Sequence, residues 1–159
     1  MLKEILQIKK EEVNEVFNFK PSYKFEKIDS SYEVNLNIDN EIIKILFIKI
    51  DLIYDISFFR NDSTELLNLN KSTFKILSAV KNIIFDFIDK YNPKIITFTT
   101  SDKDIKRFRI YSKLCDNIRN NKNYNQTSLN TLYDLHKDET IFILYKNIDL
   151  NKIKKDYFI

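Results

Sequence analysis

The sequence predicts a single mixed α/β domain, and three observations lead to this prediction. A chain of 159 residues has the length of one domain and is long enough to bury a core. Its first half alternates apolar and polar residues, which is typical of strands, whereas a helical period begins near residue 71. The second half then passes from strand to helix to strand, a connection that normally places neighbouring strands parallel.

The composition limits the possible classes of protein. Hydrophobic residues make up 43% and aromatic residues 14%, which excludes a disordered chain. The 26 basic and 23 acidic residues nearly balance, so the net charge of +3 does not by itself require a nucleic-acid or membrane partner. The single cysteine, Cys115, excludes an intramolecular disulfide, and with one histidine it cannot form a usual structural zinc site. We therefore expect no metal.

Glycine is absent from the chain, and this is the strongest compositional feature. Positions that need a positive φ, or a close approach of backbone to phosphate, must use Asn, Asp or Lys instead. Glycine-rich phosphate loops are therefore excluded. No apolar run approaches the roughly 20 residues that cross a bilayer, and the N-terminus lacks the core of a signal peptide. We expect an intracellular protein that does not enter membranes.

The first half predicts a helix followed by an antiparallel meander. Apolar residues recur with the helical period over residues 2–18, and Pro21 ends this helix. An edge strand is expected around Phe25, and Asp39-Asn40 provides a hairpin turn without glycine. The other expected strands cover residues 31–39, 41–50 and 52–59. The strand at 41–50 is apolar on both faces, so we expect it in the middle of the sheet.

The second half predicts two helices between strands. Residues 71–91 carry an apolar stripe at helical spacing, with Ser72 or Thr73 as the N-cap and Asn92-Pro93 as the end. The remaining expected elements are a strand at 94–100, a helix at 102–120, a short helix around Leu132 and a strand at 140–147. The predicted single domain thus has an N-terminal helix at 2–18, a core at 22–146 and a tail at 147–159.

Residues 71–115 resemble the second half of the GNAT superfamily of N-acetyltransferases. In that family a phosphate-cradling loop opens a long helix, and a second helix carries a tyrosine motif. Here "IKRFRIYSKLC" stands at that motif, with Tyr111 at the tyrosine and Cys115 at the usual glycine. The stretch from 74 to 114 is also similar to uncharacterised tailed-phage proteins with a degenerate version of this fold. The order of elements resembles the family over about residues 32–146.

The resemblance implies a site for acetyl-coenzyme A if the protein is active. Backbone N–H groups at the start of the 71–91 helix would hold the diphosphate, helped by four residues in place of the missing glycines. Tyr111 would act as general acid toward the thiolate, and Asp55, or Glu33 through a water, as base. The alternative is that Tyr111 belongs to the core and Asp55 is a solvated strand residue. The cofactor residues implied are Asn70, Lys71, Ser72 and Thr73.

The helix at 102–120 carries basic residues, three of which share one face. Lys106, Arg109 and Lys113 follow the i, i+3, i+7 spacing and could contact nucleic-acid phosphates. The alternative is that these residues, with Lys103, Arg107 and Arg119, form the water-facing side of an amphipathic helix. Aromatic residues are not interleaved with the basic ones, as they would be in a typical RNA-binding surface. The tail ends in aromatic residues that either dock on the domain or contact a partner.

These observations lead to one expected function and two alternatives. We expect a phage-type accessory protein with a degenerate acetyltransferase-like fold, which needs no cofactor and binds another protein, of phage or host, or its own copies. It would work in the host cytoplasm or in the virion. The first alternative is an acetyl-CoA-dependent N-acetyltransferase, and the second is a nucleic-acid-binding protein.

Overall fold

The computed structural model describes residues 19, 21–62, 71–101, 105–128 and 139–157. The predicted helix at 2–18, the short helix near Leu132 and the proposed cofactor residue Asn70 lie outside these residues. Within the described part, strands and helices follow the order that the sequence predicts, with two additional elements.

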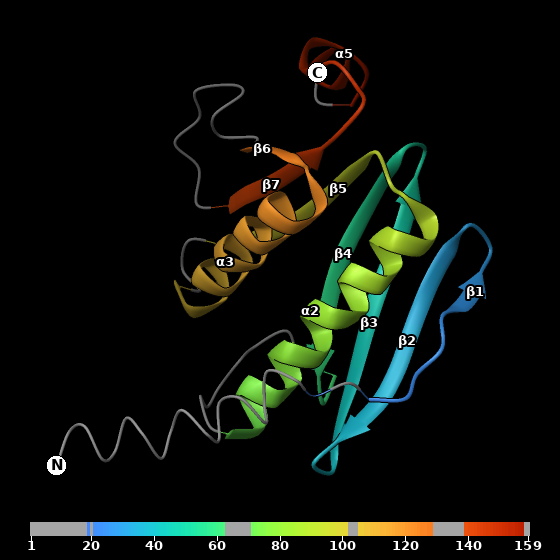
Figure 1. Cartoon of the computed structure of the whole chain (residues 1–159), viewed down its shortest axis with the longest axis vertical. Helices are drawn as coiled ribbons and strands as arrows, with labels where there is room; N and C mark the ends of the chain where they lie inside the picture. Colours follow the sequence, from blue (N-terminus) through green and yellow to red (C-terminus); the bar gives the residue numbers. More distant parts are fainter. Residues whose placement is uncertain (1–18, 20, 63–70, 102–104, 129–138, 158–159) are drawn as a thin grey trace, which may run out of the picture.

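A seven-stranded mixed sheet forms the centre of the molecule (Figure 1). The strands lie side by side in the order β1-β2-β3-β4-β5-β7-β6. Neighbouring strands pair antiparallel except β4 and β5, which are parallel. The strands are β1 (Glu26–Ile28), β2 (Ser31–Ile38), β3 (Glu41–Ile50), β4 (Ile53–Arg60), β5 (Ile95–Ser101), β6 (Asn125–Ser128) and β7 (Glu139–Tyr145).

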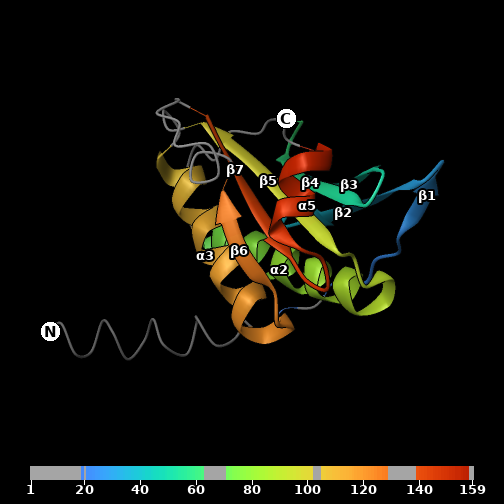
Figure 2. The ribbon, with the colours of Figure 1, turned by 90° about the horizontal axis from the view of Figure 1, so that it is seen from above.

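Helices lie on both faces of the sheet, as Figure 2 shows. The helices α2 (Lys71–Tyr91) and α3 (Ile105–Lys122) cover one face, here called the inner face, and α5 (Leu150–Tyr157) lies on the outer face. The main core forms between the sheet and α2 with α3, where Phe87 of α2 stacks on Phe47 of β3 with 4.0 Å between ring centroids. A smaller apolar cluster forms where Ile153 of α5 meets β4, β5 and β7.

The predicted mixed α/β fold with a GNAT-like order of elements is confirmed by this topology. The antiparallel meander is followed by α2. The strands β4 and β5, which precede and follow α2 in the sequence, are parallel, as the sequence predicts. β3 lies between β2 and β4, the central place expected from its apolar residues on both faces. On the outer face of β3, Ile42, Ile48 and Ile50 are exposed to solvent.

Two elements were not predicted, and several strands begin or end one or two residues from the expected positions. β6 is a short polar strand without the alternation that would reveal it, and α5 lies in the expected tail. The tail docks on the domain through Ile153 and through Tyr157, whose hydroxyl donates to Asp51 at 2.8 Å. α2 begins at Lys71, so Ser72 and Thr73 lie in its first turn and are not its N-cap.

Asn and Asp replace glycine wherever the described backbone turns left-handed. Every described residue with positive φ is an Asn or Asp, including both residues of the Asp39-Asn40 turn. Asn92 and Asn123 follow α2 and α3 with φ of 47° and 59°, in the position that usually terminates a helix with glycine. The expectation that Asn and Asp substitute for glycine is confirmed, whereas Lys does not take this role in the described residues.

We expect Asn92→Gly to stabilise the protein and Asn92→Ala to destabilise it. Glycine adopts the left-handed conformation without steric cost, whereas alanine pays about 1 kcal/mol. The melting temperature should move by roughly 2 to 4 °C in opposite directions. As a control, Asn120→Gly on the exposed side of α3 should lower it, because glycine weakens a helix. Destabilisation by Asn92→Gly would contradict the assignment of this helix end.

Candidate functional site

The strands β4 and β5 separate shortly after they begin. They pair at three positions, from Ile53 with Ile95 to Asp55 with Thr97. β4 continues to Arg60 and β5 to Ser101, but no pairing joins these later parts. Where two parallel strands separate, their backbone N–H and C=O groups lose their partners in the sheet. Another part of the chain must then supply hydrogen bonds to the groups that are buried.

The side chain of Arg107 from α3 occupies this parting. Its Nη2 donates to the backbone carbonyl of Phe58 in β4 at 3.1 Å and to the hydroxyl of Tyr111 at 2.6 Å. The guanidinium carbon lies 5.0 Å from the ring centroids of both Phe58 and Tyr111, a distance that allows cation–π attraction. Only 6% of Arg107 is exposed. The chain therefore fills the parting with its own buried cation.

Tyr111 is a buried core residue on the inner face of the sheet. It is 1% exposed and packs between Phe58 of β4 and Phe98 of β5, with ring centroids 5.7 Å and 5.3 Å away. Its hydroxyl accepts the hydrogen bond from Arg107. A general acid must reach its substrate within hydrogen-bond distance, and here the hydroxyl contacts the protein's own guanidinium. A catalytic role for Tyr111 stays a prediction.

Asp55 faces the opposite side of the sheet from Tyr111. It accepts a hydrogen bond from the Thr97 hydroxyl at 2.8 Å across the last paired position of β4 and β5. Burial raises the pKa of the Asp55 carboxyl, and the Thr97 hydrogen bond partly opposes this rise. The structure therefore does not bring the two candidate catalytic side chains together on one face, although both lie near the parting.

The first turn of α2 is tied to the meander by side chains. Ser72 donates to the carboxylate of Asp39 at 3.0 Å, and Lys75 forms an ion pair with the same carboxylate. Thr73 is fully buried and accepts from Arg60, which also makes a two-pronged ion pair with Glu41.

The start of α2 already holds an anion from the chain itself. Asp39 lies at the positive end of the helix, where the resemblance placed the coenzyme A diphosphate. A diphosphate at this position would meet a carboxylate of like charge. Of the predicted cofactor residues, Ser72 and Thr73 lie together here, whereas the side chain of Lys71 and all of Asn70 lie outside the described part.

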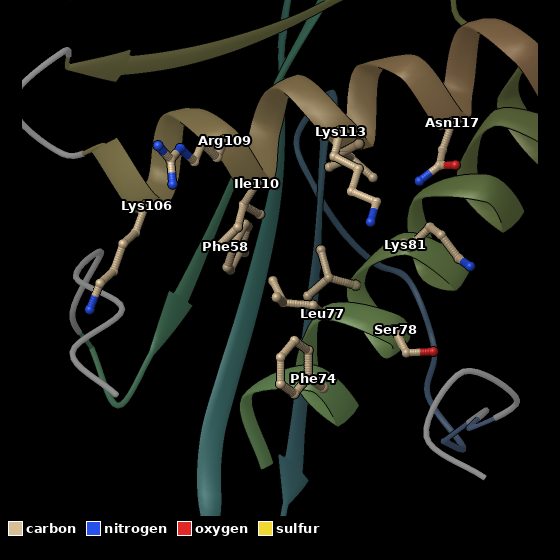
Figure 3. Close-up of a pocket in the computed structure, with 12 residues that line it drawn as sticks. Phe58, Phe74, Leu77, Ser78, Lys81, Lys106, Arg109, Ile110, Lys113 and Asn117 are labelled. Carbon is tan, nitrogen blue, oxygen red and sulfur yellow. The ribbon is translucent and has the colours of Figure 1, made fainter. Parts of the chain in front are cut away.

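A groove of about 340 Å³ runs between α2 and α3 (Figure 3). Its floor is apolar and includes Phe58 of β4, with Phe74 and Leu77 of α2 facing Ile110 of α3. Phe74 is 50% exposed, so the groove presents a large aromatic side chain to solvent. The full lining is Phe58, Phe74, Leu77, Ser78, Val80, Lys81, Lys106, Arg109, Ile110, Lys113, Leu114 and Asn117.

Basic side chains surround this apolar floor. Lys106, Arg109 and Lys113 of α3 line one side, which confirms that they share a face, and Lys81 of α2 lies on the other side. Among the described residues that line the groove, none is acidic. The groove thus combines apolar contact with positive charge, the combination that fits an amphipathic ligand with acidic groups.

Sequence reasoning missed the role of Arg107. We expected it on the water-facing side of α3, but it is buried and faces the sheet. Arg107, Tyr111, Leu114 and Ile118 follow the i, i+4, i+7, i+11 spacing, so the stripe that contains Tyr111 already included this arginine. Asp39 carried no such signal, because its contact with Ser72 spans 33 residues of sequence.

Other candidate chemistry finds no support in the described part of the chain. Burial raises the pKa of the Cys115 thiol, which disfavours the reactive thiolate. Within the ranges given above, no three His, Cys, Asp or Glu side chains gather as a metal site requires. None of the described helices is both long and apolar enough to cross a membrane.

Comparison with known proteins does not show a family for this chain. No family model matches the sequence, and no curated protein matches it. A mutant of the spermidine N-acetyltransferase SpeG from Vibrio cholerae aligns with a TM-score of 0.46 and 8% identity over 81% of this chain and 70% of its own. N-acetyltransferase PseH of Campylobacter jejuni aligns with a TM-score of 0.39 and 12% identity over 76% and 71%. The strand order and the parallel β4–β5 pair agree with the order of elements that the sequence resemblance implies.

We expect Asp55→Asn to stabilise the protein at neutral pH and to have little effect in acid. Burial raises the folded-state pKa of the Asp55 carboxyl. Its contribution to the free energy of unfolding is therefore favourable below the unfolded-state pKa and is lost as pH rises through the folded-state pKa. Asparagine keeps the acceptor for Thr97 and removes the charge. The melting temperature should rise by roughly 1 to 3 °C at pH 7, a small gain because Asp55 keeps some solvent contact.

The control for this pH profile is Asp62→Asn in the exposed turn after β4. It should leave the difference between pH 4 and pH 7 unchanged. If Asp55→Asn stabilised the protein equally at both values, the ionisation of Asp55 would not be the cause.

Proposed function

We propose that this protein is a phage-type accessory protein with an acetyltransferase-like fold that works by binding another protein and not by catalysis. The observation that carries the proposal is the position of Arg107. Its buried guanidinium occupies the parting between β4 and β5 and holds the Tyr111 hydroxyl, the group that the family resemblance would use as acid. Asp39 at the start of α2 adds support, because it takes the position of the diphosphate.

The groove between α2 and α3 supports a protein as the partner. Its apolar floor suits the apolar face of an amphipathic helix, which such grooves bind through side chains at i, i+3, i+4 and i+7. Its basic rim suits acidic side chains beside that face. Nucleic acid is favoured less, since phosphates use the rim but leave the floor in contact with water. We therefore infer an acidic amphipathic helix as the partner element.

We expect acetyl-CoA not to stabilise the protein. A ligand that binds only the folded state at 100 times its Kd adds about 2.7 kcal/mol to the free energy of unfolding. For a domain of this size that corresponds to roughly 5 to 10 °C. The melting temperature with and without millimolar acetyl-CoA should therefore agree within error. A clear rise that Ser72→Ala removes would overturn the proposal.

The second candidate function is an acetyl-CoA-dependent N-acetyltransferase, and one observation favours it. The basic groove reaches Phe58 at the parting of β4 and β5, so an anionic cofactor could run from the rim towards Tyr111. This would require Arg107 to leave its hydrogen bonds. The titration described above separates the two functions.

We expect charge reversal on the rim to abolish capture of a partner. The double variant Arg109→Glu/Lys113→Glu should lose, by at least tenfold, a protein that the wild type retains from expressing or infected cells. Lys152→Glu on the exposed side of α5 is the matched control and should retain it. Equal retention by all three forms would place the partner surface elsewhere. A nucleic acid that co-purifies and whose mobility shift weakens steeply with salt would favour the nucleic-acid alternative.

A further inference from the structure

The outer face of the sheet is only partly covered by α5. Ile153 of α5 packs against isoleucines of β4, β5 and β7, which are Ile53, Ile95 and Ile143. Figure 2 shows α5 above these strands, whereas β1, β2 and β3 extend beyond it with no described helix on that side. An α-helix with its side chains is about 10 Å across. The outer face is therefore raised where α5 lies and lower over β1–β3.

The lower part of this face exposes apolar side chains. Ile48 and Ile50 of β3 are 40% and 60% exposed, and Ile28 of β1 is 50% exposed. Ile28 is opposite Ser31 of β2, and extending the β2–β3 register by one residue brings Ser31 beside Ile48. These three side chains therefore lie in one line on the outer face, and Ile50 follows on the same face two residues along β3. Exposed apolar groups with polar residues around them are typical of a binding surface.

Acidic side chains lie beside these isoleucines. Glu26 of β1 is opposite Glu33 of β2, two residues along the strand from Ile28 and therefore on the same face. Lys24 lies 3.9 Å from the first carboxylate, and Lys44 lies 3.5 Å from the second. Ion pairs of this kind at a protein surface are weak, so both carboxylates can pair with further cations.

The helix α5 carries the opposite charge. Its exposed side chains include three lysines and one aspartate, which are Lys152, Lys154, Lys155 and Asp156. Lys155 lies about 200° around the helix from the buried Ile153, so it points away from the sheet of its own chain. The raised part of the outer face is thus basic, and the lower part is apolar and acidic.

The raised and lower parts of two copies fit together in one orientation. Ile53, which contacts Ile153 of α5, pairs with Ile50 across β3 and β4. The helix α5 therefore lies at the same level along the strands as the exposed isoleucines. A two-fold axis parallel to the strands keeps this level and carries α5 of each copy over β2 and β3 of the other. A two-fold axis across the strands would instead place one basic helix on the other.

We propose that two copies of this chain associate through their outer faces, with α5 of each copy packed on Ile28, Ile48 and Ile50 of the other. The contact is isologous, because the same two surfaces meet twice. The lysine stems of α5 cover the isoleucines, and the ammonium groups reach the acidic side chains. The helices α2 and α3 remain on the far side of each sheet, so the dimer presents two grooves. Their use by partners rests on the proposed function, whereas the association does not.

The oligomeric state of the full chain tests the proposal. Sedimentation equilibrium should show a dimer that forms as concentration rises. Ile48→Lys/Ile50→Lys should weaken the association at least tenfold, because it removes apolar contact and repels the lysines of α5. Ile42→Lys is the matched control, since Ile42 is 53% exposed on the same face of β3 but lies at its other end. A monomer at all concentrations up to millimolar, or an equal loss in the control, would overturn the proposal.

Paramagnetic labelling of α5 locates the contact. Molecules with a nitroxide on Asn151→Cys are mixed with isotope-labelled wild type, and nitroxide-treated wild type controls for the buried Cys115. Amide signals of Ile28 and Ile48 in the isotope-labelled copy should broaden at least threefold more than that of Lys113, which lines the groove on the other side of the molecule. Equal broadening, or none, would overturn the placement of α5.

A charge swap tests the predicted pairing. Lys154→Glu/Lys155→Glu should weaken the dimer at least fivefold, and adding Glu26→Lys/Glu33→Lys should restore it, because opposite charges meet again. Lys113→Glu should leave the dimer unchanged. Failure of the second pair to restore association would overturn the contact between α5 and the acidic side chains. Because these measurements use no partner and no acetyl-CoA, their failure is distinct from failure of the proposed function.

Discussion

The parting of β4 and β5 is the constraint on which the arrangement of the second half depends. Two parallel strands that separate after three paired positions leave a backbone carbonyl of β4 facing the protein interior. A buried carbonyl without a partner costs about 1–3 kcal/mol, so the gap must be filled by a donor. Arg107 supplies it from α3, and the aromatic rings of Phe58 and Tyr111 surround its charge. The cation is thus hydrogen-bonded through Nη2 and surrounded by aromatic rings.

The inward position of Arg107 also fixes the rotation of α3. Tyr111, Leu114 and Ile118 follow Arg107 on the buried side of the helix. Arg109 and Lys113 then face away from the core and line the groove. The buried contact of Arg107 with Phe58 and the basic rim of the groove therefore both follow from one orientation of α3.

The start of α2 shows how the chain manages without glycine. A glycine loop would let the backbone approach an anion closely. Here the Asp39-Asn40 turn, left-handed at both residues, carries a carboxylate to the first turn of α2 and receives Ser72. Arg60, paired with Glu41, joins the same turn through Thr73. The helix start is held to the sheet by side chains of this chain, which favours a structural use of the positive end of the helix.

The sequence by itself determined the features that depend on local or periodic patterns, whereas only the tertiary structure decided which distant side chains meet. The local features include the order of the elements, the parallel pair around α2, the Asn and Asp turns and the common face of Lys106, Arg109 and Lys113. Side-chain period and backbone conformation are set within a few turns. β6 lacks an alternating pattern and α5 is only eight residues long, so neither was predicted. The contact between Arg107 and Phe58 spans 49 residues of sequence, and the placement of Tyr111 and Asp55 on opposite faces depends on how α3 crosses the sheet. Such pairings arise when the folded backbone brings distant elements together, and a linear pattern does not contain that distance.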